Sequence, residues 1–284
     1  MTNVTPDHSN TSGSQDLPPR VASFLASYEM GPGVVTAEQG ALHPDLAPTI
    51  LRMQVLDTPF TFGTIDSFLP DELYQAILRE WPESSAFNPV AKFVDGRPDA
   101  YFGTRKERIL ENWAAGDQLD SDTWGTVRLA LRHPDFVRAL FTRFAETIET
   151  NLAALDLDVL RTSSFKLYAN VDAGVSEALG AHVDALPKLL TIVVYLDLTG
   201  PVSDSSPDRW GTALYAMKPG EIQPLSFTAN ADHIVAHQIR FRPNRAFVMP
   251  NDSQALHGVP GGEDGVQRRT LMCGYWLSKQ TSRD

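Results

Sequence analysis

The feature that most constrains the fold of this 284-residue chain is a change in hydrophobic periodicity near residue 160. Before this point, Pro134 to Leu155 carries apolar residues at intervals of three and four, which predicts a helix. After it, short segments of strand character follow one another, separated by turn-forming residues. This order favours an antiparallel two-sheet barrel with a helical brace over a βαβ fold. The candidate strands are 162–170, 188–198, 210–217, 238–242, 245–250 and 269–276.

The first half of the chain is expected to support this barrel. A strand is predicted over 58–65, followed by a helix that begins near Pro70 and carries acidic residues in its first turn. One apolar face of this helix is formed by Leu73, Ile77 and Trp81. His133, just before the helix at 134–155, is expected to be a helix-entry residue.

We expect a single domain that follows a polar lead. Residues 1–20 are rich in Ser, Thr, Asn and Asp and lack the apolar segment of a secretory signal, so we expect them to be disordered. Residues 21–284 would form one domain, with 21–158 as an α-rich support and 159–284 as the barrel core. Residues 24–40 are expected to be irregular, because glycine and proline interrupt them.

Composition limits the classes of function. The net charge of −11 argues against nucleic acid or an anionic membrane surface as partner. No apolar segment approaches the roughly 18 residues that are needed to span a bilayer. The single cysteine, Cys273, excludes a disulfide framework within the chain and is expected to be a small core residue. The chain is therefore expected to be a soluble protein of the reducing cytoplasm.

Three polar side chains in the second half could hold a metal ion. His182 and Asp184 are two residues apart beside an apolar segment, so in an extended chain they would project to the same face. His257 is available as a third ligand. Two imidazoles and one carboxylate with open coordination positions form the facial triad of non-haem Fe(II) oxygenases, whereas a closed set of four ligands is typical of structural zinc.

An arginine pair, Arg268-Arg269, follows the distal histidine and leads into the last predicted strand. A buried arginine beside an iron site would provide a bidentate anchor for a carboxylate. The competing interpretation of the predicted metal site is a barrel in which the His and Asp residues are merely buried and hydrogen-bonded. A structural role alone gives no reason for an arginine at this place, so the metal-site interpretation is favoured.

In this order of motifs the chain resembles the Fe(II)/2-oxoglutarate-dependent dioxygenases, in particular the prolyl-4-hydroxylase-like branch. That branch shows His-x-Asp, a strand that ends in Tyr-Leu-Asn, Trp-Gly-Gly-x-Leu, Asn-Arg, a distal His-x-Val and Arg-x-Ser-Leu. The corresponding segments here are His182-Val183-Asp184, Tyr195-Leu196-Asp197, Trp210-Gly211-Thr212-Ala213-Leu214, Asn244-Arg245, His257-Gly258-Val259 and Arg268-Arg269-Thr270-Leu271. The similarity covers roughly residues 162–277, and Thr212 replaces the second glycine of the turn.

The resemblance implies a fold, cofactors and residue roles. The fold would be mainly β with helical support, a double-stranded β-helix (a jelly-roll or cupin-like barrel) braced by N-terminal helices. The Fe(II) ligands would be His182, Asp184 and His257, with 2-oxoglutarate and O₂ as co-substrates. The residues that would bind 2-oxoglutarate are Arg268, Thr270, Tyr195 and Tyr168. The family spacing to Thr270 favours Arg268 as the anchor, and strand alternation would turn Arg269 outward.

The implied activity is hydroxylation of an unactivated C–H bond, with succinate and CO₂ as co-products. The substrate would be an amino acid or a small natural-product intermediate, free or bound to a carrier or a peptide. Asp184 argues against halogenation, because related halogenases have Gly or Ala at this position. Two alternatives stay open: a protein or peptide side-chain hydroxylase of the same family, and a non-catalytic jelly-roll binding module. Desaturation or cyclisation also stays open as the outcome.

Other polar and aromatic residues are weaker candidates. His233 and His237 could share a helical face as a second metal site, but a surface or substrate-facing role is favoured. The basic cluster at 105–108 is expected to be a solvated face, with an anionic substrate group as the alternative partner. Trp210 and Trp276 are expected in the core.

Overall fold

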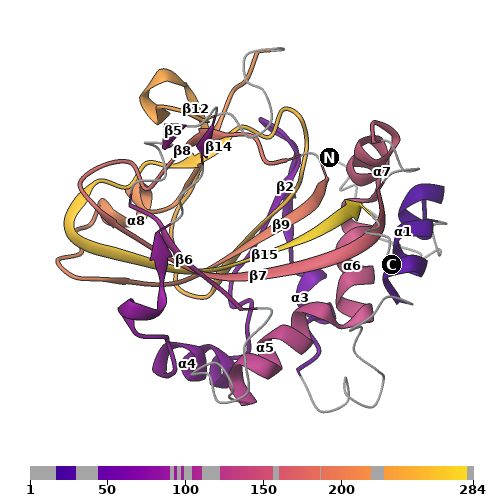
Figure 1. Ribbon diagram of the computed structural model, residues 1–284, viewed down its shortest axis with the longest axis horizontal. Helices are drawn as coiled ribbons and strands as arrows, with labels where there is room; N and C mark the ends of the chain where they lie inside the picture. Colours follow the sequence, from indigo (N-terminus) through magenta and orange to yellow (C-terminus); the bar gives the residue numbers. More distant parts are fainter. Residues whose placement is uncertain are drawn as a thin grey trace, which may run out of the picture.

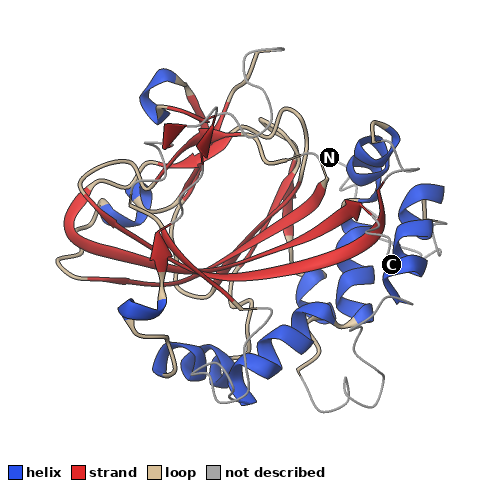
Figure 2. Ribbon diagram, viewed as in Figure 1, coloured by secondary structure: helices blue, strands red, loops and turns tan. Residues whose placement is uncertain are grey.

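Two antiparallel sheets face each other in the computed structural model, and helices pack on the outer face of the larger sheet (Figure 1, Figure 2). The structure describes residues 17–29, 44–89, 93–94, 97–98, 104–110, 122–155, 160–185, 187–218 and 227–279. The disorder expected for residues 1–16 concerns a segment outside these residues. The predicted fold class, a mainly β double-stranded β-helix with helical support, is confirmed.

Within the described residues the larger sheet has eight strands in the order β1-β2-β13-β9-β15-β7-β6-β3, and each neighbouring pair is antiparallel. The long strands β7, β9 and β15 form its centre (Figure 1). The strand bounds are β1 Gln54–Leu56, β2 Phe62–Ile65, β13 Arg245–Pro250, β9 Lys188–Thr199, β15 Glu263–Lys279, β7 Leu160–Gly174, β6 Lys106–Ile109 and β3 Asn88–Pro89.

The part of the smaller sheet that the structure describes has five strands in the order β11-β8-β14-β10-β12. Their bounds are β11 Phe227–Thr228, β8 Leu179–His182, β14 His257–Val259, β10 Thr212–Tyr215 and β12 Val235–Ile239. A separate ribbon pairs β4 Phe93–Val94 with β5 Arg97–Pro98. The sequence did not predict β8 and β14, because each is too short to show an alternating pattern. The strand predicted over 238–242 lies over 235–239 instead.

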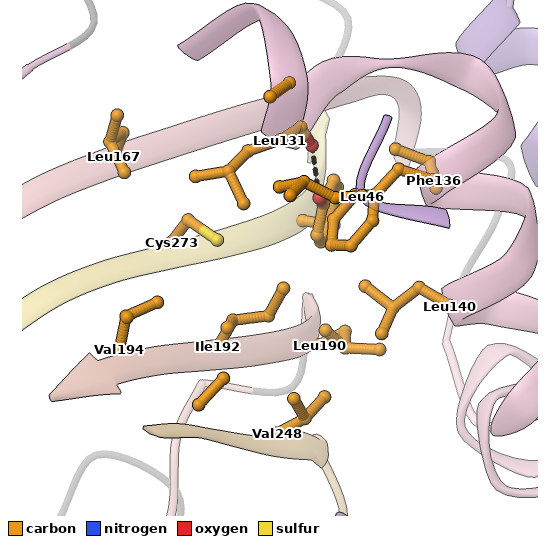
Figure 3. Packing of buried hydrophobic residues seen from close by; sticks show 14 of the residues in the cluster. Leu46, Leu131, Phe136, Leu140, Leu167, Leu190, Ile192, Val194, Val248 and Cys273 are labelled. Atoms are coloured by element: carbon orange, nitrogen blue, oxygen red, sulfur yellow. Dashed lines mark hydrogen bonds between the residues drawn. The ribbon is translucent and has the colours of Figure 1, made fainter. Parts of the chain in front are cut away.

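The central strands place alternate residues on opposite faces of the larger sheet, as the pleat requires. On β15, Leu271, Cys273 and Tyr275 belong to the core between sheet and helices, and the residues between them face the smaller sheet. Figure 3 shows Cys273 of β15 beside Leu167 of β7 and Ile192 of β9, in one layer with the helix residues. Cys273 is therefore a core residue, as predicted.

Apart from the short helix at 206–209, the described α-helices cover the outer face of the larger sheet and its end (Figure 1, Figure 2). None of them is long and apolar enough to cross a membrane. The α-helices are α1 Pro19–Glu29, α3 Ala47–Ile50, α4 Asp71–Arg79, α5 Asp122–Arg132, α6 Pro134–Arg143, α7 Ala145–Ala153 and α8 Ser206–Arg209, and two 3₁₀ turns are η1 Ser84–Ala86 and η3 Asn230–Asp232.

The N-terminal helix α1 corrects two expectations from the sequence. It begins at Pro19, inside the expected lead, and its residues up to Glu29 occupy part of the stretch that was expected to be irregular. Phe24 is 4% exposed and its ring stacks on Phe141 of α6, with centroids 4.7 Å apart. Tertiary packing therefore stabilises this helix.

The helix predicted over 134–155 is interrupted at Phe144. This residue has φ −118° and ψ 22°, so α6 ends before it and α7 begins after it. His133 is the N-cap of α6, as predicted, and its Nδ1 accepts a hydrogen bond from the backbone N–H of Asp135 at 3.3 Å. Helix α4 is confirmed, but it ends at Arg79, and Trp81 beyond it stacks on Phe87 instead of extending the helix face.

Leu140 tests the layer between α6 and the sheet. Leu140→Ala is expected to lower the free energy of unfolding by about 2–5 kcal/mol, because it leaves a cavity in a fully buried layer. The matched control is Leu51→Ala, whose side chain is 86% exposed and whose loss should change stability by less than about 0.5 kcal/mol. Urea unfolding followed by circular dichroism measures both. Equal losses would contradict the packing of α6 on the sheet.

Candidate metal centre

The three predicted ligands meet where two neighbouring strands of the smaller sheet pair. His182 is the last residue of β8, His257 is the first residue of β14, and the two are direct partners in the strand register. Asp184 follows β8 by two residues. One nitrogen of each imidazole and one carboxylate oxygen all lie within 4.8 Å of one another. The structure thus brings together the set that the sequence predicted, and no other group of three His, Cys, Asp or Glu within the described ranges is so arranged.

Backbone carbonyl groups fix the orientation of both imidazoles. Nδ1 of His182 lies 2.9 Å from the carbonyl oxygen of Gly180, and Nδ1 of His257 lies 2.9 Å from that of Ala255. A protonated Nδ1 that donates to a carbonyl leaves the lone pair of Nε2 free for a cation. Burial lowers the pKa of both histidines below its usual value, so both rings are neutral at pH 7, as metal ligands must be.

The carboxylate of Asp184 is held by one of its two oxygens. Oδ2 accepts hydrogen bonds from Nζ of Lys188 at 2.8 Å and from Oγ1 of Thr191 at 2.9 Å. Oδ1 lies 3.8 Å from Nε2 of His182 and is left for a cation. Burial alone would raise the pKa of Asp184, but the neighbouring Lys188 ammonium, which also donates a hydrogen bond to the carboxylate, outweighs it and holds that pKa well below its usual range.

Contacts from two other segments hold the ligands in place. Asn251, which follows β13, donates through its side-chain amide to the carbonyl oxygen of Ala185, next to Asp184. The backbone N–H of Asn251 donates to the carbonyl oxygen of Leu189 at 2.9 Å. Phe227 of β11 stacks on the ring of His182, with centroids 4.6 Å apart. Supporting contacts of this kind orient ligands before a metal binds.

The cluster lines a cavity of about 260 Å³ between the two sheets. Of the residues predicted to bind 2-oxoglutarate, Tyr168, Arg268 and Thr270 line this cavity. Tyr195 does not line it directly. Its hydroxyl forms a 2.7 Å hydrogen bond with Oγ1 of the lining residue Thr212, and its ring lies 5.2 Å from the guanidinium carbon of Arg268.

Asp172 joins two guanidinium groups at the wall of the cavity. Its two oxygens accept from Nε and Nη2 of Arg105 at 2.7 and 2.9 Å, and Oδ2 also accepts from Nη1 of Arg268 at 2.7 Å. Asp172 is 0%, Arg268 1% and Arg105 8% exposed. One carboxylate thus neutralises only one of two buried cations. Nε of Arg268 has no hydrogen-bond partner within the described part of the chain, so the cluster has both the charge and a donor for a further anion.

The two adjacent arginines point to opposite faces of the sheet, as strand alternation predicted. Arg269 lies on the helix side, with Nη1 3.5 Å from Asp197 and its guanidinium carbon 5.8 Å from the Trp81 ring centroid. The expectation of a solvated face at 105–108 is wrong for Arg105, which is buried against Asp172, although Lys106 is exposed. The sequence contains one indication that Arg105 belongs to the site, namely the alternative in which the basic cluster contacts an anionic group of the substrate.

The disfavoured alternative, in which His233 and His237 share a helical face as a second metal site, is wrong. His237 lies on strand β12, with its ring centroid 5.0 Å from that of Phe62. Nε2 of His233 lies 2.6 Å from Oγ1 of Thr228. Neither residue belongs to the cluster of potential metal ligands.

Several lining residues were missed from the sequence. Lys188 and Thr191 lie at the start of β9, where the apolar run hides their role. Asp172 of β7, which lies behind the arginines, was also missed. The expectation of a core position is confirmed for Trp210, which is fully buried, and wrong for Trp276, which lines the cavity. Strand alternation could have predicted this position, because Trp276 is an even number of residues from Arg268 and therefore lies on the same face of β15.

No family model matches the chain, and no curated protein matches its sequence. Solved structures do match it. A prolyl 4-hydroxylase from Phytophthora capsici is 17% identical, with a TM-score of 0.50, and the match covers 89% of this chain and 71% of that one. A Pseudomonas putida prolyl-4-hydroxylase is 14% identical, with a TM-score of 0.48, over 82% of this chain and 99% of that one. A 2OG-Fe(II) oxygenase family oxidoreductase from Burkholderia pseudomallei is 13% identical, with a TM-score of 0.46, over 78% of this chain and 88% of that one.

At 17% identity, the likeness to the Phytophthora capsici enzyme is a likeness of fold. It agrees with the two facing antiparallel sheets and with the helices on the outer face of the larger one. The chemistry of the cavity is therefore argued from its own residues.

Asp172→Asn tests the buried arginine pair. The change is expected to lower the free energy of unfolding by about 3–5 kcal/mol, because two buried guanidinium groups lose their carboxylate. The control is Asp208→Asn, since Asp208 is 55% exposed and 3.7 Å from Arg240, and its loss should cost less than about 1 kcal/mol. Chemical denaturation measures both. A cost for Asp172→Asn as small as that of the control would contradict the arrangement.

The same comparison has a defined pH dependence. Burial raises the pKa of Asp172, but the two arginines lower it more, so the folded-state pKa lies below the unfolded-state value of about 4. The stability difference between wild type and Asp172→Asn should therefore be fully present above about pH 4 and be lost as the pH falls through the folded-state pKa. A difference that grows on acidification would contradict this sign.

Proposed function

We propose that this chain is an Fe(II)- and 2-oxoglutarate-dependent oxygenase. It would hydroxylate an unactivated C–H bond of a small molecule, an amino acid or natural-product intermediate, and release succinate and CO₂. The observation that carries the proposal is the meeting, in one cavity, of a two-histidine, one-carboxylate cluster and a buried arginine with an unused donor. The cluster offers three ligands to a cation, and the arginine offers an anchor to a carboxylate.

The donor set fits Fe(II). Nε2 of His182, Nε2 of His257 and Oδ1 of Asp184 would hold the ion, and three nitrogen and oxygen ligands leave positions for a co-substrate and O₂. When bound, Fe(II) would supply the activation of O₂ that accompanies the oxidation of 2-oxoglutarate. The hydrogen bonds of Lys188 and Thr191 to Oδ2 favour coordination through a single oxygen of Asp184.

The arginine end of the cavity fits the distal carboxylate of 2-oxoglutarate. Arg268 would donate through Nε, and the hydroxyl of the neighbouring inner-face residue Thr270 would add a hydrogen bond. The Tyr195 ring supports the guanidinium, and burial raises the pKa of Tyr195, which keeps its hydroxyl protonated. Tyr168, on the adjacent strand, would contact the same co-substrate. These residues bind and orient, and none needs to transfer a proton.

The remaining wall suits a carbon skeleton. Val193, Phe247 and Met272 line the cavity on the face of the larger sheet, and Val259 lines it from the smaller one. Apolar walls beside the cluster would hold a substrate carbon near the metal and keep water out. The carboxylate at Asp184 supports oxygen transfer over halide transfer, because it takes the coordination position that a halide would need.

Asp184→Ala is expected to abolish succinate formation, because two imidazoles alone would neither bind Fe(II) firmly nor fix its position in the cavity. Succinate release from 2-oxoglutarate would be measured in air and under anaerobic conditions, with panels of amino acids, small metabolites and peptides. Asp208→Asn serves as the control and should keep the wild-type rate. Succinate formation by Asp184→Ala at the wild-type rate would eliminate the proposed ligand set, and a response to peptides only would favour a protein substrate.

The adjacent arginines form a matched pair of variants. Arg268→Ala is expected to raise the KM for 2-oxoglutarate at least about tenfold, equivalent to about 1.4 kcal/mol, because a charge-assisted anchor is removed. Arg269→Ala should change that KM by less than about twofold, because Arg269 lies on the other face of the sheet. Steady-state succinate release measures both constants. The opposite ranking would show that Arg269 is the anchor.

A further inference from the structure

A second cationic corner lines the same cavity and has no part in the proposed binding of metal and 2-oxoglutarate. Lys166 of β7 is half-buried, and its Nζ lies 4.6 Å from the ring centroid of Trp276 of β15. No hydrogen bond or ion pair joins this ammonium group to another described residue. A cation that is partly withdrawn from water and has only an aromatic ring beside it can accept an anion at little cost.

Trp276 supplies an unused donor at this corner. Its Nε1 is buried and has no hydrogen-bond partner within the described residues, and the side chain lines the cavity. Gly274 makes room for the indole, since a Cβ at this position would lie 2.8 Å from Nε1 of Trp276 and 2.9 Å from Cε of Lys188. In the strand register Gly274 is the direct partner of Lys166. Lys166 and Trp276 therefore offer two donors from adjacent strands.

This corner is next to the metal ligands and apart from the arginine anchor. Lys188, which binds Asp184, also lies with its Nζ 5.6 Å from the Trp276 ring centroid. Arg268 precedes Gly274 by six residues on β15, which is about 20 Å along a strand. The two anion-binding regions would thus lie on opposite sides of the cluster, and one small dicarboxylate could not occupy both.

The charge of the cavity supports a further anion. The protein carries a net charge of −11, yet Arg105, Lys166, Lys188 and Arg268 line the cavity against the carboxylates of Glu107 and Asp184. Asp172 lies behind the two arginines and neutralises one of them. The double charges of a divalent metal and of 2-oxoglutarate would cancel each other. One positive charge then remains, and among the described residues that line the cavity Lys166 is the cation with no ion pair to a carboxylate.

We propose that the substrate carries a carboxylate, which Nζ of Lys166 and Nε1 of Trp276 bind while the carbon to be hydroxylated faces the metal cluster. This substrate class deepens the proposed function and rests on it for the reaction. The carboxylate subsite itself can be tested by binding alone. The class includes free amino acids and other small acids, and it leaves out amides and internal peptide segments that lack an acidic group.

The test follows the indole N–H signal of Trp276 by NMR in protein labelled with ¹⁵N-tryptophan. Zn(II) replaces Fe(II) so that no turnover occurs, 2-oxoglutarate is saturating, and loss of one signal in Trp276→Phe assigns the resonance. Acetate is the probe and acetamide is its neutral counterpart. We expect acetate to shift the Trp276 signal in a saturable way and acetamide to leave it in place. Lys166→Met should raise the Kd for acetate at least about tenfold, and the exposed Lys106→Met control should not change it.

Three results would overturn the proposal: no shift with acetate, an equal shift with acetamide, or an unchanged Kd in Lys166→Met. A loss of 2-oxoglutarate affinity in Lys166→Met as large as its loss of acetate affinity would also overturn it, because Lys166 would then serve the co-substrate. Calorimetry of Zn(II) and 2-oxoglutarate is done first. If neither binds, the proposed function fails, and the acetate titration without them still decides whether the subsite exists.

Discussion

The structure depends on the pleat of three adjacent strands, β7, β9 and β15. One set of alternate residues packs on the helices, and the other set lines the cavity. A one-residue slip of any of these strands would move its polar residues into the apolar layer and its apolar residues into the cavity. The long register between β15 and both of its neighbours makes such a slip costly. The helices thus contribute to the site indirectly, because the layer they bury fixes which residues face inward.

Most of the buried cationic side chains at the cavity are paired with a carboxylate. Lys188 faces Asp184, and Arg105 faces Asp172, so each pair offsets much of its own desolvation cost. Three donors lack acceptors within the described residues, namely Nε of Arg268 at one place and Nζ of Lys166 and Nε1 of Trp276 at another. Unused donors at two separate places, and a cluster of ligands between them, support the proposal that the cavity takes two different anionic molecules.

The sequence predicted the parts of this arrangement that follow from local pattern and motif order. The helix at α4, the long strands and the ligands His182, Asp184 and His257 are of this kind. The sequence did not predict α1 or the break at Phe144, because both depend on packing against distant segments. It also gave Lys166 and Trp276 no role in the site, and it gave Arg105 one only through the alternative of an anionic substrate group. Their part appears only when β6, β7 and β15 lie side by side, which no short-range spacing in the chain reveals.

One further consequence concerns the strand β9. Thr191, which holds the Asp184 carboxylate, and Tyr195, which supports Arg268, lie four residues apart on this strand. Their separation is therefore set by the rise of the backbone, about 13 Å for four residues, and side-chain length has little influence on it. An insertion of two residues would keep both side chains on the inner face and lengthen the interval by about 7 Å. Under the proposed function, the main-chain geometry of β9 would therefore set the distance between the metal ligands and Arg268, and with it the length of the diacid that fits between them.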